Sequence, residues 1–73
     1  MIYNEEKILI GIGDNIKSIM FEKDITLAEL SRKTKIAPCA INKYLVGSSA
    51  PTLKTAMILC NALDVHIDKL IGA

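Results

Sequence analysis

The sequence predicts an all-α protein that folds as one compact domain of five short helices. Its length of 73 residues leaves room for a single domain. About half of the residues are hydrophobic, but only two Tyr and one Phe are aromatic, which suits helices packed through Ile, Leu, Met and Ala. These hydrophobic residues recur every three or four positions, the spacing of one helix face, and residues typical of caps and turns separate the runs.

The first two helices are expected over residues 12–23 and 27–34. The first has an apolar face at helical spacing, made of Ile12, Ile16, Ile19 and Met20. Asp24 follows it and tolerates the left-handed conformation in which helices often end. Thr26 is a good cap for the second helix, and Glu29, three residues later, completes a capping-box pattern. This helix is expected to bury Leu30 and Ser31 together with Leu27 or Ala28.

A short turn at Lys35 and Ile36 leads to a third helix over residues 38–46. Pro38 suits the first position of a helix, because its missing N–H would have no helical partner there anyway. Gly47 is expected to end this helix. The predicted inner face consists of Ile41, Tyr44 and Leu45, at positions i, i+3 and i+4.

A fourth helix is expected over residues 53–63, with Thr52 as its cap. Its predicted inner side consists of Leu53, Ala56, Met57, Cys60 and Leu63. Asp64 and Val65 then turn the chain into a short fifth helix over residues 67–71. The residues expected to close the core from this last helix are Ile67, Leu70 and Ile71.

Residues 1–11 fit two interpretations. The stretch IYNEEKILI reads either as a strand or as a helix, capped by Asn4, that continues into the first predicted helix. Gly11 and Gly13 weigh against one continuous helix, because glycine is a poor helix former. We therefore treat residues 1–11 as an N-terminal extension and residues 12–73 as the domain.

The charges are unevenly distributed along the chain, although the net charge is only +1. Between Leu30 and Leu63 there is no acidic residue, whereas the rest of the chain carries eight. The basic residues of this window are Arg32, Lys33, Lys35, Lys43 and Lys54. A basic middle between acidic ends favours a polyanionic partner, and the alternative is a scatter of solvated lysines.

Several classes of protein find no support in the sequence. No apolar run approaches the length that spans a membrane, and the N-terminus does not resemble a signal peptide. Cys39 and Cys60 fit free thiols in a reducing cytoplasm, with an oxidation switch at Cys39 as the alternative to a space-filling role. One histidine, His66, and no CxxC pair predict neither a zinc site nor a catalytic pair. We expect no metal, no cofactor and no enzymatic activity.

Four segments occur in a recognisable order, IGDNIKSI, ITLAELSRKTKIAPCAINKYLVG, PTLKTAMILCNALDV and IDKLIG. In this order they resemble the lambda-repressor-like (Xre-type) helix-turn-helix family, over residues 12–72. The resemblance implies a compact five-helix lambda-repressor-like DNA-binding domain, with the helix-turn-helix at its second and third helices. It also implies that the third helix lies in the major groove of double-stranded DNA, and that a homodimer binds two half-sites about one DNA turn apart.

The resemblance assigns roles to individual residues. The positions that would face base edges are Pro38, Cys39, Asn42 and Lys43. The candidates for phosphate contacts are Thr26, Lys35, Ser48, Ser49 and Lys54. Only Asn42 and Lys43 can form polar base contacts, because Pro38 and Cys39 offer apolar surface that suits a thymine methyl group. Direct reading of the base sequence is therefore expected to be limited.

Other positions depart from the family pattern. Leu27 stands where relatives usually have a glutamine that anchors phosphate, and Lys35 stands where the turn usually has glycine. Relatives often hold a partly buried ion pair at the positions of Met20 and Leu45, and both are apolar here, so we expect Leu45 in the core. The remaining apolar departures suggest a self-association surface, namely Phe21, Val46, Ile58 and the stretch at residues 8–12.

These observations together predict a small transcriptional regulator of a prokaryote or phage, located in the cytoplasm. The alternative is a protein-interaction module on the same scaffold, such as an antitoxin or antirepressor component with a protein partner. The missing glutamine at Leu27 favours this alternative. The acid-free basic window between Leu30 and Leu63 favours DNA.

Overall fold

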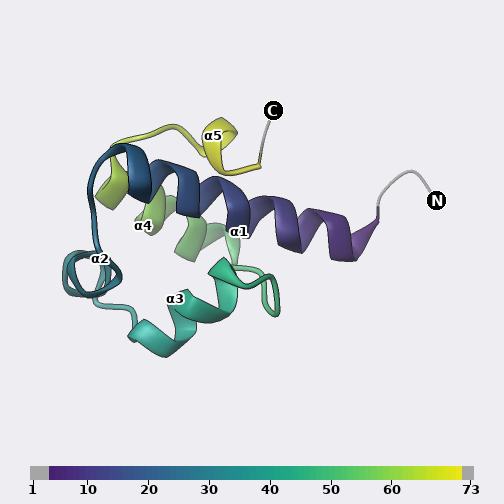
Figure 1. Ribbon diagram of the computed structural model, residues 1–73, viewed down its shortest axis with the longest axis horizontal. Coiled ribbons are helices and arrows are strands. Elements are labelled where there is room, and N and C mark those ends of the chain that lie inside the picture. The colour runs from purple at the N-terminus through teal and green to yellow at the C-terminus, as the bar shows by residue number, and fades with distance from the viewer. Residues whose placement is uncertain (1–3, 72–73) are drawn as a thin grey trace.

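The computed structural model describes residues 4–71 and contains five helices and no strand within that range (Figure 1). They are α1 (Glu5–Glu22), α2 (Leu27–Thr34), α3 (Pro38–Leu45), α4 (Leu53–Leu63) and α5 (Ile67–Ile71). α1 packs against α3 and α5, and α4 packs against α2 and α5. The predicted all-α, five-helix architecture is confirmed. Within residues 4–71, none of the helices combines the length and the hydrophobicity that a membrane-spanning helix requires.

The first helix begins earlier than the predicted start at residue 12. Asn4 caps it, since the Asn4 side-chain oxygen accepts a hydrogen bond from the Lys7 backbone N–H at 3.1 Å. Of the two interpretations of residues 1–11, a strand is therefore wrong for the part that the structure describes, and residues 1–3 lie outside the described range. Gly11 and Gly13 lie inside the helix. Each glycine costs about 1 kcal/mol relative to alanine in a helix, and the packing of α1 along α3 and α5 outweighs this cost.

Gly13 has a packing reason that its sequence position did not reveal. A Cβ atom at Gly13 would lie 2.5 Å from the carbonyl oxygen of Tyr44 and 2.6 Å from that of Leu45. These distances are too short for any side chain, so only glycine lets α1 approach the C-terminal end of α3 this closely.

The chain turns through the left-handed region at the predicted positions. The φ angles of Asp24, Lys35 and Asp64 are 54°, 61° and 57°, after α1, α2 and α4 respectively. Gly47 has a φ of 77° and follows α3. Aspartate tolerates this conformation better than most residues, whereas lysine is a less common choice.

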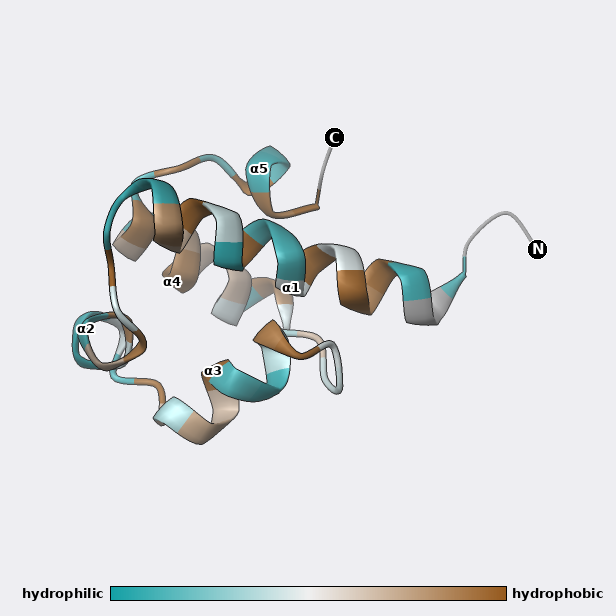
Figure 2. Cartoon of the chain, in the orientation of Figure 1, coloured by the Kyte–Doolittle hydropathy of each residue, from teal (hydrophilic) through white to brown (hydrophobic). Residues whose placement is uncertain are grey.

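The core contains residues from all five helices. Its fully buried side chains are Ile16, Leu30, Ile41, Leu59, Leu63 and Leu70. Tyr44 and Leu45 are half-buried and pack against it, broadly as predicted. Figure 2 shows hydrophobic and hydrophilic residues alternating along α1, as expected for a helix with one buried face.

Three residues predicted to be in the core are exposed instead. Leu53 is 72% exposed, Met57 55% and Ile71 57%, so these predictions are wrong. The buried face of α4 consists of Ala56, Leu59, Cys60 and Leu63. Apolar residues occupy most positions of α4, so the hydrophobic period does not define which side faces inward.

Candidate nucleic-acid interface

The start of α2 is fixed by the predicted capping box. The Thr26 hydroxyl oxygen accepts a hydrogen bond from the Glu29 N–H at 3.1 Å, and the Glu29 carboxylate accepts one from the Thr26 N–H at 3.4 Å. The Thr26 hydroxyl also donates to the Glu29 carboxylate at 3.1 Å. Thr26 is exposed, but its hydroxyl is already engaged and an acid lies beside it. Both features weaken Thr26 as a phosphate ligand.

The turn between α2 and α3 is held by side-chain hydrogen bonds in place of glycine. The Lys35 N–H donates to the Ser31 carbonyl at 2.8 Å, which closes α2. The Ser31 hydroxyl donates to the Ile36 carbonyl at 2.6 Å, and the Ile36 N–H donates to the Thr34 hydroxyl oxygen at 3.2 Å. These bonds satisfy backbone groups at the turn and offset the cost of a left-handed lysine.

The third helix presents the four predicted base-contact residues on its outer side. Ile41 is fully buried and anchors α3 in the core. Pro38, Cys39, Asn42 and Lys43 are all exposed. They occupy positions i, i+1, i+4 and i+5, which share one side of a helix. Figure 1 shows α3 at the lower edge of the molecule, with no other helix beyond it in this view.

The first turn of α3 has no polar side chain. Its N-cap is Ala37, which makes no side-chain hydrogen bond to the helix, and Pro38 occupies the first helical turn. The polar part of the outer side is therefore confined to Asn42 and Lys43, one turn further along. Any direct recognition through the first turn would be apolar.

In the loop after α3, hydrogen bonds hold Ser48 against the end of the helix. The Ser48 N–H and hydroxyl both donate to the Lys43 carbonyl, at 3.0 Å and 3.2 Å. Ser48 is exposed, whereas Ser49 is half-buried and is the least accessible of the predicted phosphate ligands. Lys54 is exposed on the first turn of α4. The hydrogen bonds place Ser48 next to the predicted reading helix.

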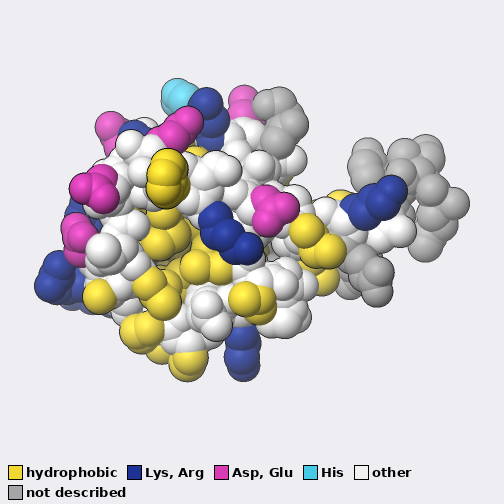
Figure 3. Space-filling view, in the orientation of Figure 1, with side chains coloured by type: hydrophobic (Ala, Val, Ile, Leu, Met, Phe, Trp, Pro, Cys, Tyr) yellow, Lys and Arg dark blue, Asp and Glu magenta, His cyan; other side chains and the backbone are white. Residues whose placement is uncertain are grey.

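The basic residues of the central window are all exposed. Arg32, Lys33 and Lys35 lie together at the C-terminal end of α2, while Lys43 and Lys54 lie on α3 and α4. Among residues 4–71, the ion pair found joins Lys17 to Asp14, so none of these five cations is paired there. Figure 3 shows basic and hydrophobic side chains, and no acidic ones, along the lower edge of the molecule where α3 lies.

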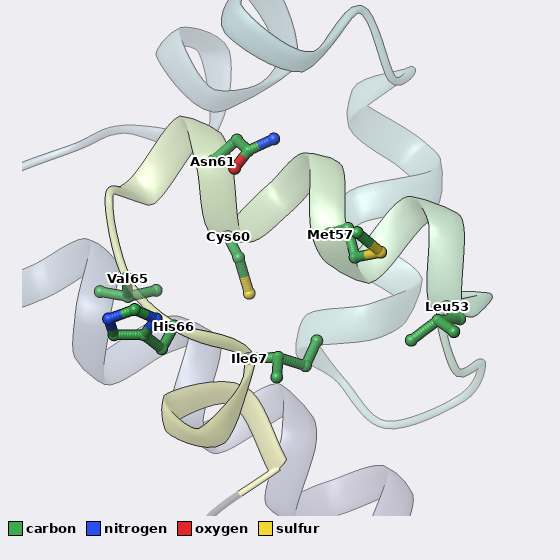
Figure 4. Close-up of a pocket in the computed structure, with 7 residues that line it drawn as sticks. All are labelled: Leu53, Met57, Cys60, Asn61, Val65, His66 and Ile67. Carbon is green, nitrogen blue, oxygen red and sulfur yellow. The ribbon is translucent and has the colours of Figure 1, made fainter.

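A groove between α4 and α5 lies apart from the predicted contact residues. Leu53 and Met57 of α4 face Ile67 of α5 across it, with His66 at one end (Figure 4). Its volume is about 300 Å³. None of the nine predicted DNA-contact residues lines it. This groove could not be seen in the sequence, because helical spacing places Leu53 and Met57 on the predicted inner side of the fourth helix.

The two cysteines are in different environments. Cys39 is exposed on the outer side of α3. Cys60 is 5% exposed, and burial raises the pKa of its thiol above the ordinary value. The Cys60 thiol therefore stays protonated and acts as a small apolar residue, as predicted.

The chain is similar to known proteins over most of its length. The Helix-turn-helix family model matches residues 16–70, which include all of α2, the turn and α3. The SPbeta prophage-derived uncharacterized HTH-type transcriptional regulator YopO of Bacillus subtilis (strain 168) is 32% identical over 60 residues. The similarity covers 82% of this chain and 86% of that relative. The chain therefore belongs to the lambda-repressor-like (Xre-type) helix-turn-helix family.

Proposed function

We propose that this protein is a sequence-specific DNA-binding transcriptional regulator of the prokaryotic or phage cytoplasm. Residues 38–46 would lie in the major groove, and the protein would bind as a homodimer. The observation that carries the proposal is the outer side of α3, which is exposed and has exposed basic residues on the helices around it, none of them ion-paired within residues 4–71. The family assignment and the similarity to a prophage-derived regulator also support it.

Base recognition falls to few side chains. Lys43 donates to guanine O6 and N7, and Asn42 pairs with adenine N6 and N7 or with a phosphate. Pro38 and Cys39 contact thymine methyl groups. Each good polar contact discriminates by about 1–3 kcal/mol, so two of them give modest specificity. The remaining specificity would come from the shape and deformability of the DNA.

Most of the affinity would come from the phosphate backbone. Lys35 and Lys54 are exposed cations, and Ser48 lies against the end of α3. Ser49 and Thr26 contribute less, because Ser49 is half-buried and the Thr26 hydroxyl is engaged with Glu29. These contacts set the register of the helix on the duplex without reading its sequence.

Salt dependence of binding tests the proposal. Binding to mixed-sequence duplexes should weaken steeply with salt, with a log–log slope of about −0.9 for each neutralised phosphate. Lys35→Ala and Lys54→Ala should each make the slope shallower by about one contact. Lys17→Ala is the matched control, because Lys17 lies on α1 beside Asp14 and should leave the slope unchanged. A flat salt dependence of the unmodified protein would contradict the proposal.

A second candidate function is a protein-interaction module on the helix-turn-helix scaffold. Leu27 favours it, because this residue is half-buried against the core and cannot replace a glutamine that anchors phosphate. Such a module would bind a protein partner and show little affinity for DNA. Selection from random duplexes separates the two functions, since a regulator enriches a consensus sequence and an interaction module does not.

A further inference from the structure

The N-terminal half of α1 extends beyond the other helices (Figure 1). It precedes residue 16, where the match to the family model begins. Two large hydrophobic side chains are exposed on it, Ile8 at 44% and Ile10 at 53%. Packing within the described chain leaves about half of the surface of each residue in contact with water. This part of α1 therefore lies before the residues that match the family model and carries partly uncovered apolar surface.

Gly11 lies within this segment, and packing among the described residues gives no reason for a glycine there. In the part of the chain that the structure describes, nothing lies within 4 Å of the position that a Cβ atom would take there. Gly13 prevents a clash with α3, and Gly47 adopts a positive φ, so these two glycines have reasons within the chain. A glycine inside a helix lowers helix stability, but it lets a second backbone approach closely.

Charged residues flank Gly11 on the same side of the helix. Lys7 lies four residues before it and Asp14 three residues after it, so helical periodicity places all three in one row. Lys7 and Asp14 are exposed, and Ile8 and Ile10 lie on either side of the row. Figure 3 shows basic, acidic and hydrophobic side chains alternating along the side of α1 that faces the viewer.

We propose that a second copy of the chain packs against this row, with the two α1 helices antiparallel and crossing at Gly11. A two-fold axis at the crossing brings Lys7 of each copy to Asp14 of the other, because the two residues lie at nearly equal distances from Gly11. The surface is thus self-complementary in charge, as an isologous dimer requires. The same packing removes Ile8 and Ile10 of both copies from water.

The existing partner of Asp14 does not prevent this pairing. Lys17 lies 3.7 Å from the Asp14 carboxylate, but both side chains are more than half exposed. An exposed pair of this kind is weak, and a carboxylate has two oxygens that can each accept from a cation. Asp14 can therefore bind Lys7 of the second copy without losing Lys17.

The inferred dimer would also fix the positions of the two copies of α3 relative to each other. Ile10 lies beside Gly47, and Gly13 lies beside the last carbonyls of α3, so α1 is joined closely to the end of the reading helix. A dimer through α1 would fix the separation of the two copies of α3, which sets the spacing of half-sites. This part of the inference rests on the proposed function, whereas self-association does not.

Sedimentation equilibrium tests the surface directly. The unmodified protein should reach a monomer–dimer equilibrium, and Ile10→Lys should raise the dimer dissociation constant at least tenfold. Ile71→Lys is the matched control, because Ile71 is 57% exposed on α5, outside the row. Equal effects of the two substitutions, or a monomer at every concentration of the unmodified protein, would overturn the inference.

Three further variants separate the contribution of packing from that of charge. Gly11→Leu should fold normally, because the monomer has open space there, and should sediment as a monomer. Lys7→Glu alone should weaken the dimer, and Lys7→Glu combined with Asp14→Lys should restore it. Dimerisation of Gly11→Leu, or failure of the double charge reversal to restore association, would contradict the proposed crossing.

DNA binding distinguishes this inference from the proposed function. Monomeric Gly11→Leu should keep the salt-dependent binding of a single domain to mixed DNA but lose tight binding to a selected two-half-site operator. If the unmodified protein dimerises through α1 and binds no DNA, the proposed function fails and the dimer surface stands. If it binds DNA and Gly11→Leu binds the operator equally tightly, the dimer surface is wrong.

Discussion

Leu45 and Met20 are both apolar at positions where relatives often have an ion pair. It is half-buried against the core, and Met20, at the position of the usual ion-pair partner, is 9% exposed. Two apolar residues can replace a buried ion pair at little cost, whereas one charge left without its partner is strongly destabilising. Both residues are apolar and pack in or against the hydrophobic core, in line with the prediction that Leu45 is a core residue.

Leu45→Glu should therefore lower the melting temperature. The new carboxylate would be half-buried, and the apolar Met20 at the position of the ion-pair partner could not neutralise it. A loss of about 1–2 kcal/mol corresponds to roughly 4–16 °C in a domain of this size. Val46→Glu is the control, because Val46 is 60% exposed and should tolerate the charge. Thermal denaturation measures both. An unchanged melting temperature of Leu45→Glu would rule out the packing of Met20 and Leu45 in one core.

Cys60 gives stability a dependence on pH. Burial raises the pKa of its thiol, so the folded state holds the proton more firmly than the unfolded state, whose thiol titrates near 9.0. The stability should be fully present below about pH 9 and should fall as the pH rises toward the raised pKa. Chemical denaturation between pH 7 and about 10 should show a steeper fall for the unmodified protein than for Cys60→Ala. Parallel pH curves for the two proteins would contradict this prediction.

The elements of the fold differ in how locally they are specified. Thr26 and Thr52 cap α2 and α4 through their own side chains, as the local sequence predicts. α1 does not follow local propensity, because its two interior glycines are compensated by packing against other helices. Short-range signals therefore locate helix ends well, whereas the length of α1 depends on α3 and α5.

The two glycines of α1 should respond in opposite directions to alanine. Gly13→Ala should destabilise the fold, because its Cβ atom would force α1 and α3 apart. Gly11→Ala should stabilise the monomer by about 1 kcal/mol, since the position is open and alanine is the better helix former. Denaturation at low protein concentration, where monomers predominate, measures both. The same sign for both substitutions would contradict the close approach at Gly13.

At the scale of the whole molecule, the distribution of charge matters more for DNA binding than the net charge does. The net charge is only +1, yet the window between Leu30 and Leu63 carries five cations and no acid. All five are exposed, and three of them lie at the end of α2 nearest the turn. A duplex would meet a local positive field there despite the nearly neutral chain.

Two variants of equal net charge test the distribution. Lys33→Glu on α2 should lower affinity for mixed DNA several-fold, whereas Lys69→Glu on α5 should have little effect, because only the first lies in the basic window. Fluorescence anisotropy at fixed salt compares them. Equal losses would mean that total charge alone governs binding.

The sequence by itself determined the number of helices, most of their ends and the family. These features depend on local chemistry, on threonine caps, on proline at the start of α3 and on left-handed residues after three helices. The outer position of Asn42 and Lys43 also follows from helical spacing once Ile41 is assigned to the core. Their contact with DNA stays a prediction.

Only the tertiary structure decided which side of α4 is buried and how far α1 extends. Leu53 and Met57 are as apolar as Leu59 and Leu63, so composition could not distinguish the groove side of α4 from the core side. Likewise, two glycines within three residues do not differ in propensity, although one allows close contact with α3 and the other faces open space. Burial depends on which other helices are present, and that information is not contained in any single segment.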